Sequence, residues 1–184
     1  NPDSGKTFNI INMAASMALK GSRTLIVDLD LRKATLSKAL EKNNRGVAAY
    51  LNSKTDHISE YIQPIMDNLS ILSVGTLPPN PAELLVSERF STMIETLRGD
   101  FDYIFVDCPP IDVVADTAII SRVADMSVFI IRANMFDKRS LPMLESLYKE
   151  GKYKRMALIL NGVEASHNHG YGYGYGYGYG YGYG

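Results

Sequence analysis

The residues with the clearest chemical potential lie at the start of the chain. Gly5-Lys6-Thr7 matches the last three positions of the phosphate-binding pattern G-x-x-x-x-G-K-[ST], whose first glycine would precede Asn1. In such a loop, backbone N–H groups and the dipole of the following helix bind phosphate. We expect Lys6 to reach the β- and γ-phosphates of a nucleotide and the Thr7 hydroxyl to bind Mg²⁺. The alternative is an ordinary turn before a helix, with Lys6 solvated. The residues expected to bind nucleotide in this segment are Asp3, Ser4, Gly5, Lys6, Thr7 and Phe8.

Aspartates follow two apolar runs further along the chain. Asp28 and Asp30 follow Thr24–Val27, and Asp107 follows Tyr103–Val106. Each run is too short for a helix and is typical of a strand buried on both faces of a parallel sheet. Ligands bind at the carboxyl ends of such strands, so we expect the carboxylates to share one site, with Asp107 holding Mg²⁺ directly or through water. The alternatives are a solvated polar turn for the first pair and a helix cap for Asp107.

Helices and strands that alternate along the chain must position these residues. Apolar residues at helical spacing predict a helix over Phe8–Leu19, directly after the loop. Further helices are predicted over residues 36–41, 47–51, 81–98, 115–123 and 141–148, and further strands over 69–74, 127–131 and 156–160. This alternation predicts an α/β fold with a doubly wound, mainly parallel sheet and helices on both faces.

The composition excludes several classes of protein. A length of 184 residues suits one domain, and a net charge of -1 gives no general reason to expect nucleic acid as a partner. Cys108 is the single cysteine, which excludes an internal disulfide and a multi-cysteine metal or iron–sulfur site and fits a reducing compartment. We expect Cys108 to be a packed residue rather than a nucleophile. Because the phosphate-binding motif normally follows a strand, we expect the chain to be a fragment whose first strand lies upstream.

The last part of the chain differs sharply in composition. From Gly170 onward, glycine and tyrosine alternate strictly, and glycine at every second position resists both helix and strand. We therefore predict a domain over residues 1–165 and a flexible tail over 166–184. The tail is either low-complexity disorder or a cluster of phosphate acceptors. Its tyrosines are Tyr171, Tyr173, Tyr175, Tyr177, Tyr179, Tyr181 and Tyr183.

Together these segments carry a family resemblance. The chain resembles the bacterial tyrosine kinases of the capsule and exopolysaccharide co-polymerase family over essentially its whole length. The motifs that carry it are Gly5-Lys6-Thr7, Val27–Lys33, Leu77–Phe90, Asp107–Pro110 and Asp116–Ile120, followed by the tyrosine-rich end. The resemblance implies a P-loop NTPase-like fold, the cofactors ATP and Mg²⁺, and transfer of the γ-phosphate to tail tyrosines. Cys108 stands where the family would have threonine, a change we expect to be tolerated.

The resemblance also implies roles for single residues and partners for the chain. The catalytic set is Lys6, Asp28, Asp30 and Asp107, and the magnesium ligands are Thr7, Asp30 and Asp107. One aspartate of the pair Asp28 and Asp30 would help to place Mg²⁺ and one would accept the proton of the tyrosine. Asn161 lies where related ATPases contact adenine. The family implies a ring of subunits that phosphorylate one another's tails, a tyrosine phosphatase, and a fused or separate membrane protein on whose cytoplasmic side the kinase lies.

Two other functions remain open. A partition or division-site switch ATPase of the same superfamily would hydrolyse ATP without tyrosine transfer. Such proteins carry a second lysine early in the phosphate loop, and the matching position here is Asn1. A regulatory nucleotide-binding module without transfer activity is the other alternative. The seven tail tyrosines favour the kinase over both.

Overall fold

Helices and strands alternate along the computed structural model, which describes residues 4–40, 45–109 and 114–163. The helices are α1 (Lys6–Leu19), α2 (Thr35–Ala39), α3 (Val47–Asn52), α4 (Pro81–Val86), α5 (Glu88–Asp100), α6 (Val114–Val123) and α7 (Leu141–Lys149), with 3₁₀ turns η1 (Ile58–Tyr61) and η2 (Lys138–Ser140). The strands are β1 (Thr24–Asp28), β2 (Ile62–Met66), β3 (Leu69–Leu72), β4 (Tyr103–Asp107), β5 (Ser127–Arg132) and β6 (Met156–Asn161). The predicted α/β alternation is therefore present.

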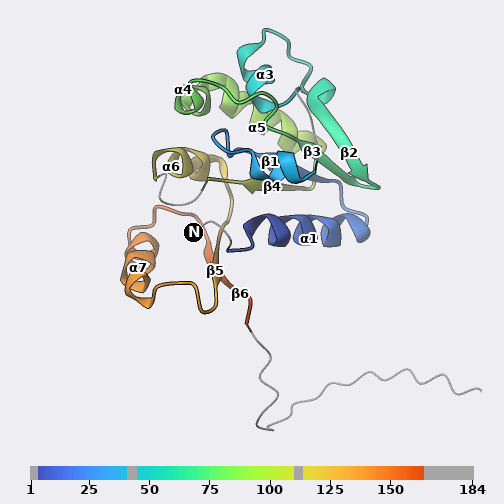
Figure 1. The fold of residues 1–184 in the computed structure, drawn as a ribbon. Helices are drawn as coiled ribbons and strands as arrows, with labels where there is room; N and C mark the ends of the chain where they lie inside the picture. Colours follow the sequence, from blue (N-terminus) through green and yellow to red (C-terminus); the bar gives the residue numbers. More distant parts are fainter. Residues whose placement is uncertain (1–3, 41–44, 110–113, 164–184) are drawn as a thin grey trace, which may run out of the picture.

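The strands of the described residues form two sheets. The larger has the order β2-β3-β1-β4, in which β1 is parallel to both of its neighbours and β2 is an antiparallel edge strand. The smaller sheet pairs β5 with β6 in parallel. The strands β1 and β4 lie side by side (Figure 1). Their register sets Asp28 opposite Asp107, so the carboxyl ends of the two strands bring both aspartates to one edge.

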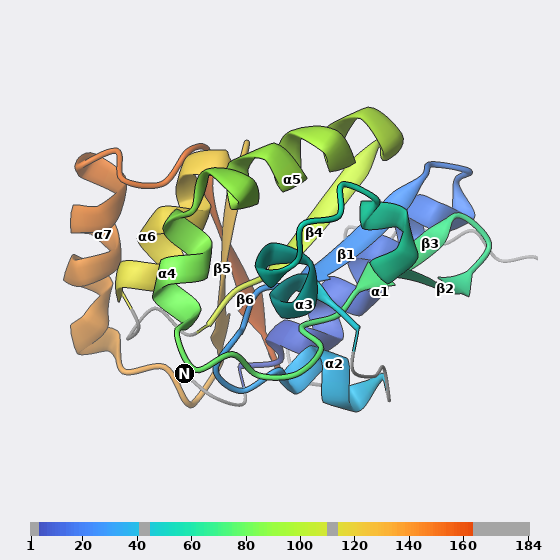
Figure 2. The same cartoon turned by 90° about the horizontal axis from the view of Figure 1, so that it is seen from above.

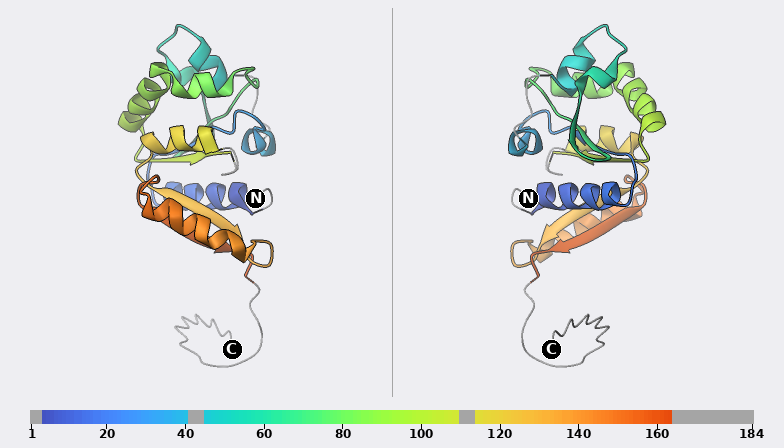
Figure 3. Two further views of the ribbon diagram at one scale, coloured as in Figure 1. Left: turned by 90° about the vertical axis from the view of Figure 1, so that its left-hand side faces the viewer. Right: turned by 90° about the vertical axis from the view of Figure 1, so that its right-hand side faces the viewer.

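Helices cover both faces of the larger sheet. The helix α1 lies on one face, and α3, α4 and α5 lie on the other (Figures 1 and 2). The alternation of strand side chains explains this arrangement, because Leu25 and Val27 join the core beneath α5 while Ile26 packs with Ala14 and Ala18 of α1. All five residues of β1 are buried, as expected for a central parallel strand. The helix α7 lies along the β5–β6 pair (Figure 3).

Three details differ from the pattern in the sequence. The single helix predicted over 81–98 is wrong, because Ser87 adopts an extended ψ of 147° and its hydroxyl accepts a hydrogen bond from the N–H of Phe90 at 3.2 Å, which starts a second helix. The strand β2 carries no alternating pattern that would have revealed it. The strand β4 is less buried than predicted, since Tyr103 is exposed and, within the described residues, β4 pairs only with β1.

Candidate active site

Gly5 gives the phosphate loop its shape. Its φ is +86°, in the left-handed region that glycine adopts without strain, and a Cβ at this position would overlap the side-chain amide of Asn161. The Asn161 Nδ2 donates to the carbonyl of buried Ser4 at 2.9 Å, which ties the end of β6 to the loop. The Asn9 Nδ2 donates to the Gly5 carbonyl, also at 2.9 Å. The loop is therefore held through its backbone carbonyls by side chains from β6 and α1. Asp3 lies outside the described residues.

Lys6 bridges the phosphate loop and the end of β4. Its Nζ donates to the Asp107 Oδ1 at 2.9 Å and to the carbonyl of Cys108. The Lys6 side chain is 35% exposed, whereas that of Asp107 is 1% exposed, so the ammonium contacts a buried carboxylate from the solvent side. Residues 101 positions apart in the sequence thus meet at one point.

Asp107 has an unused acceptor in its buried carboxylate. Its Oδ2 has no hydrogen-bond partner within the described part of the chain. Burial raises the pKa of the Asp107 carboxyl above its ordinary value, an effect that the Lys6 ammonium opposes and the nearby Asp30 increases. A buried carboxylate oxygen without a partner costs free energy unless a cation or donor satisfies it. This atom therefore fits a ligand of Mg²⁺.

Asp28 is occupied by contacts within the fold. It is fully buried, and its Oδ1 accepts the N–H of Asp30 at 3.0 Å. Its Oδ2 accepts both the N–H and the hydroxyl of Ser37, at 2.9 and 2.6 Å. The Ser37 hydroxyl in turn accepts the N–H of Val74 at 3.0 Å. Burial raises the pKa of Asp28, and the hydrogen bonds from Ser37 work against that rise. Asp28 thus holds together the segment after β1, α2 and the end of β3, and no sequence pattern pointed to Ser37.

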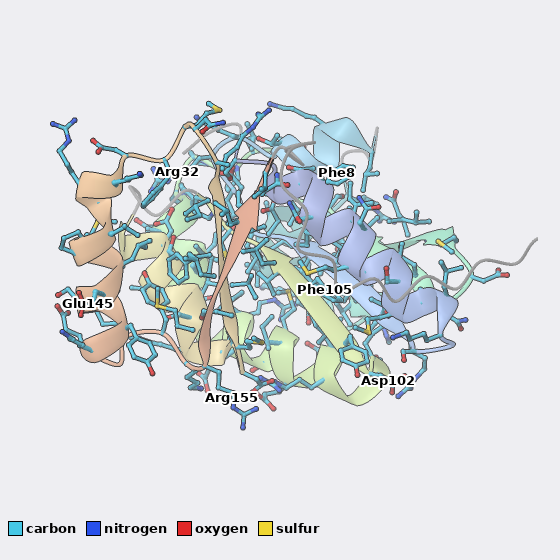
Figure 4. The ribbon with its side chains drawn as sticks, turned by 90° about the horizontal axis from the view of Figure 1, so that it is seen from below. Phe8, Arg32, Asp102, Phe105, Glu145 and Arg155 are labelled. Carbon is cyan, nitrogen blue, oxygen red and sulfur yellow. The ribbon has the colours of Figure 1, made fainter. Side chains whose placement is uncertain are left out.

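Asp30 and the first turn of α1 complete the described site. Asp30 is 3% exposed, and its Oδ1 accepts the N–H of Lys33 at 3.1 Å. Thr7 lies in the first turn of α1, directly after Lys6, and Phe8 follows with an exposed ring (Figure 4). The structure therefore brings Lys6 into direct contact with Asp107 and places Asp28 opposite Asp107 across the β1–β4 pair.

These residues fit a magnesium–nucleotide complex. The described residues contain no group of three or more His, Cys, Asp or Glu side chains arranged to hold a metal ion. Mg²⁺ does not require such a cage, because it commonly uses one or two carboxylates together with phosphate oxygens and water. Thr7, Asp30 and Asp107, with the unpartnered Oδ2 of Asp107, are a donor set of this kind.

The Cys108 thiol stays outside these contacts, although the backbone carbonyl of the same residue accepts from Lys6. Burial raises the pKa of the Cys108 thiol to about 12, and its side chain packs against the core beneath α5, as the sequence analysis predicted. The proposed phosphate acceptors all lie outside the described residues, so their roles remain predictions.

Comparison with known proteins identifies the family. A family model described as an AAA domain matches residues 3–154. The tyrosine-protein kinase CpsD of Streptococcus pneumoniae serotype 4 is 34% identical over 170 residues, which cover 91% of this chain and 75% of that protein. The chain belongs to the bacterial tyrosine kinase family. A kinase described as a putative tyrosine-protein kinase in the cps region of Klebsiella pneumoniae is 32% identical over 89% of this chain but only 23% of its own length. That relative therefore extends far beyond the matched part.

Solved structures agree with this assignment of the kinase family. The kinase domain of Escherichia coli tyrosine kinase ETK matches with a TM-score of 0.81 and 30% identity, covering 95% of this chain and 69% of that one. The septum site-determining protein MinD of Pyrococcus horikoshii shares the fold with a TM-score of 0.65 at 19% identity, over 87% of this chain and 65% of its own. The P-loop NTPase-like fold is thus shared by a tyrosine kinase domain and a septum site-determining protein.

Within the described ranges, every helix is too short or too polar to cross a bilayer.

Proposed function

We propose that this chain is an ATP-dependent protein-tyrosine autokinase that phosphorylates its own tyrosine-rich end. The observation that carries the proposal is the contact between Lys6 of the phosphate loop and Asp107 at the end of β4. It joins a phosphate-binding cation to a buried carboxylate with a free acceptor oxygen, which is the combination that phosphoryl transfer requires. Membership of the bacterial tyrosine kinase family supports tyrosine as the acceptor.

The loop residues bind and orient the triphosphate. Backbone N–H groups from Ser4 to Phe8 would bind the phosphates, and the Lys6 ammonium would offset the charge that develops on the transferring group. Thr7 and Asp107 would hold Mg²⁺, with Asp30 beside them. When bound, this ion neutralises charge on the β- and γ-phosphates. The Asn161 side chain lies against the loop from the end of β6, where it can meet the nucleoside.

Proton transfer falls to Asp30 in this proposal. The tyrosine oxygen forms a bond to the γ-phosphorus as the bond from that phosphorus to the leaving oxygen of ADP breaks. The phenolic proton passes to a carboxylate, which assists because free tyrosine has a pKa of about 10. Both oxygens of Asp28 already accept hydrogen bonds from the fold, whereas Asp30 uses only Oδ1 in a described contact. Asp28 then acts by holding the segment that carries Asp30.

Membership of the kinase family supports a proposal for the acceptors and partners. We propose that the tail of one subunit enters the site of a neighbour in a ring, and that phosphorylation of Tyr171 to Tyr183 loosens the ring. A membrane co-polymerase, fused or separate, would hold the kinase at the cytoplasmic side of the inner membrane, and a tyrosine phosphatase would reverse the modification. The process regulated would be capsule or exopolysaccharide synthesis, because one relative is described as a putative tyrosine-protein kinase in a cps region.

Phosphotyrosine mapping by mass spectrometry tests the function. The purified chain is incubated with ATP and Mg²⁺, and the tail peptides are compared with those of Lys6→Met, which keeps the side-chain length but removes the charge. We expect modified tail tyrosines in the unaltered chain and none in the variant. A variant with phenylalanine at all seven tail tyrosines controls for labelling elsewhere. Rapid ATP hydrolysis with an unmodified tail would instead identify a switch ATPase.

A further inference from the structure

A two-point ion pair joins the segments that follow β1 and β4. The Arg32 Nε donates to the Asp116 Oδ2 at 2.8 Å, and a second guanidinium nitrogen donates to Oδ1 at 3.3 Å. The arginine side chain is 46% exposed, but that of Asp116 is only 2% exposed. A bidentate contact fixes both the distance and the relative orientation of its partners. It therefore sets how the two segments lie against each other.

One partner lies in a turn held by an active-site carboxylate, and the other lies on the helix that follows a second carboxylate in the chain. Arg32 lies in a turn that begins at Asp30, because the N–H of Lys33 donates to the Asp30 Oδ1 at 3.1 Å and the N–H of Ala34 donates to the Asp30 carbonyl at 2.8 Å. Asp116 lies in the first turn of α6, the helix that follows β4 and Asp107 in the chain. The pair thus links the turn of Asp30 to the helix after Asp107.

Backbone pairing brings the two segments only as far as the strand ends. Among the described residues, the last backbone hydrogen bond between them is donated by the N–H of Leu29 to the carbonyl of Asp107 at 2.9 Å. Beyond this point the chain turns through Asp30 on one side and toward α6 on the other. The pair of Arg32 and Asp116 therefore acts where the sheet no longer fixes the geometry.

We propose that Arg32 and Asp116 are positioning residues, which hold Asp30 at the correct distance from Asp107 for magnesium binding and phosphoryl transfer. The proposal rests on the kinase function above. Groups that orient metal ligands without touching the metal change its affinity or the rate by about 10- to 100-fold when they are removed. Arg32 acts through Asp30, and Asp116 acts through Arg32.

The chain offers a matched control at the other end of the same strands. Arg23 and Asp102 precede β1 and β4, and their guanidinium and carboxylate also form a two-point contact, at 2.8 and 3.4 Å. Both side chains are about half exposed, at 57% and 44%. Arg32 and Asp102 lie toward opposite ends of the molecule (Figure 4). This second pair joins the same two strands without reaching the active site.

The test compares conservative variants of the two pairs. Arg32→Lys keeps the charge but loses the two-point contact, Arg32→Gln also removes the charge, and Asp116→Asn keeps the shape of the buried partner. The double variant Arg32→Lys with Asp116→Asn measures their coupling. Arg23→Lys and Asp102→Asn are the controls. For each protein we would measure kcat and KM for ATP, the Mg²⁺ concentration at half-maximal binding of a fluorescent ADP, and the melting temperature.

We expect kcat to fall by about 10- to 100-fold in Arg32→Gln and Asp116→Asn, with a smaller loss in Arg32→Lys. The KM for ATP should change by less than about two-fold, and more Mg²⁺ should be needed to retain ADP, because the shared geometry rather than nucleotide contact is lost. The double variant should be no worse than Asp116→Asn alone. The control variants should match the unaltered chain in kcat and in Mg²⁺ dependence.

Two results would overturn the proposal. A lower melting temperature with unchanged kcat and Mg²⁺ dependence would make the pair purely structural. A raised KM in the Arg32 variants with normal behaviour of Asp116→Asn would make Arg32 a direct phosphate ligand. If the unaltered chain labels no tyrosine, the proposed function fails, but the Mg²⁺ titration with ADP needs no transfer and still decides the positioning role.

Discussion

The two ends of the β1–β4 pair use similar residues in opposite ways. At the amino ends, Asp102 accepts from both the backbone and the guanidinium of Arg23, and these contacts hold its pKa below the usual range. At the carboxyl ends, Asp28 and Asp107 are buried, and burial raises the pKa of both. The amino end is solvated and its groups are paired, while the carboxyl end contains a buried oxygen that has no partner among the described residues.

This difference separates structure from chemistry on one pair of strands. A solvated ion pair contributes little to stability, and water satisfies the hydrogen-bonding groups that the pair itself does not use. A buried carboxylate with an unused acceptor costs free energy in the fold but binds a cation or a proton strongly. The contrast explains why the carboxyl end of a parallel pair can be a reactive site while its amino end, made of the same residue types, only joins strands.

Replacing one aspartate at each end by asparagine gives the largest predicted difference in the rate of tyrosine transfer. Asp107→Asn removes the anionic partner of Lys6 and the proposed magnesium ligand, so we expect tyrosine transfer to fall by about 100- to 1000-fold. Asp102→Asn weakens only a solvated pair, so the rate should stay within about two-fold. Initial rates of phosphotyrosine formation with ATP and Mg²⁺ measure both. Comparable losses in the two variants would show that the ends do not differ in function.

Removing the serine that supports Asp28 should destabilise the carboxyl end. Ser37→Ala deprives a buried carboxylate of a donor and leaves the N–H of Val74 without its acceptor. Lost contacts of this kind cost about 1–3 kcal/mol. We expect a clear decrease in the free energy of unfolding measured with urea. Ser16→Ala on the exposed side of α1, where the hydroxyl contacts the Asn12 carbonyl, is the matched control and should change little. Equal stability of the two variants would mean that the Ser37 hydroxyl does not stabilise the fold.

The two ends should also respond to pH with opposite signs. The folded pKa of Asp28 lies above its ordinary value of 3.8, so the folded state holds more protons and stability falls as pH rises from 3.8 through that higher pKa. The folded pKa of Asp102 lies below 3.8, so its contribution is present above 3.8 and is lost as pH falls through the lower value. Unfolding curves from pH 3 to 7 for Asp28→Asn, Asp102→Asn and the unaltered chain measure both slopes. If the contributions of Asp28 and Asp102 to stability changed with pH in the same direction, the predicted difference between the two ends would be wrong.

Cys108 should show that burial alone does not make a residue reactive. Its pKa of about 12 keeps the thiol protonated, and its side chain packs against the core. We expect a thiol reagent to label Cys108 only after unfolding in denaturant, and Cys108→Ser to leave tyrosine transfer within about two-fold of its normal rate. Rapid labelling of the folded chain, with loss of transfer, would add this cysteine to the site.

The sequence anticipated the elements and the motif residues because both are local properties. Helical spacing over Phe8–Leu19 and short apolar runs before Asp28 and Asp107 needed no knowledge of distant residues. The same local reasoning failed at Ser87, since a single residue with an extended backbone divides a continuous apolar pattern into α4 and α5. It also missed β2, whose pairing with β3 gives the segment its strand structure.

The sequence by itself determined which residues can do chemistry here: a lysine after a glycine, and aspartates after apolar runs. Only the tertiary structure decided which hydrogen bonds and ion pairs these side chains form within the fold. It pairs both oxygens of Asp28 with Ser37 and Asp30 and joins Arg32 to Asp116 across 84 residues. It also leaves Oδ2 of Asp107 without a partner among the described residues. The physical reason is that side-chain type fixes what a group can donate or accept, whereas burial and partners from distant segments fix what remains available for a ligand.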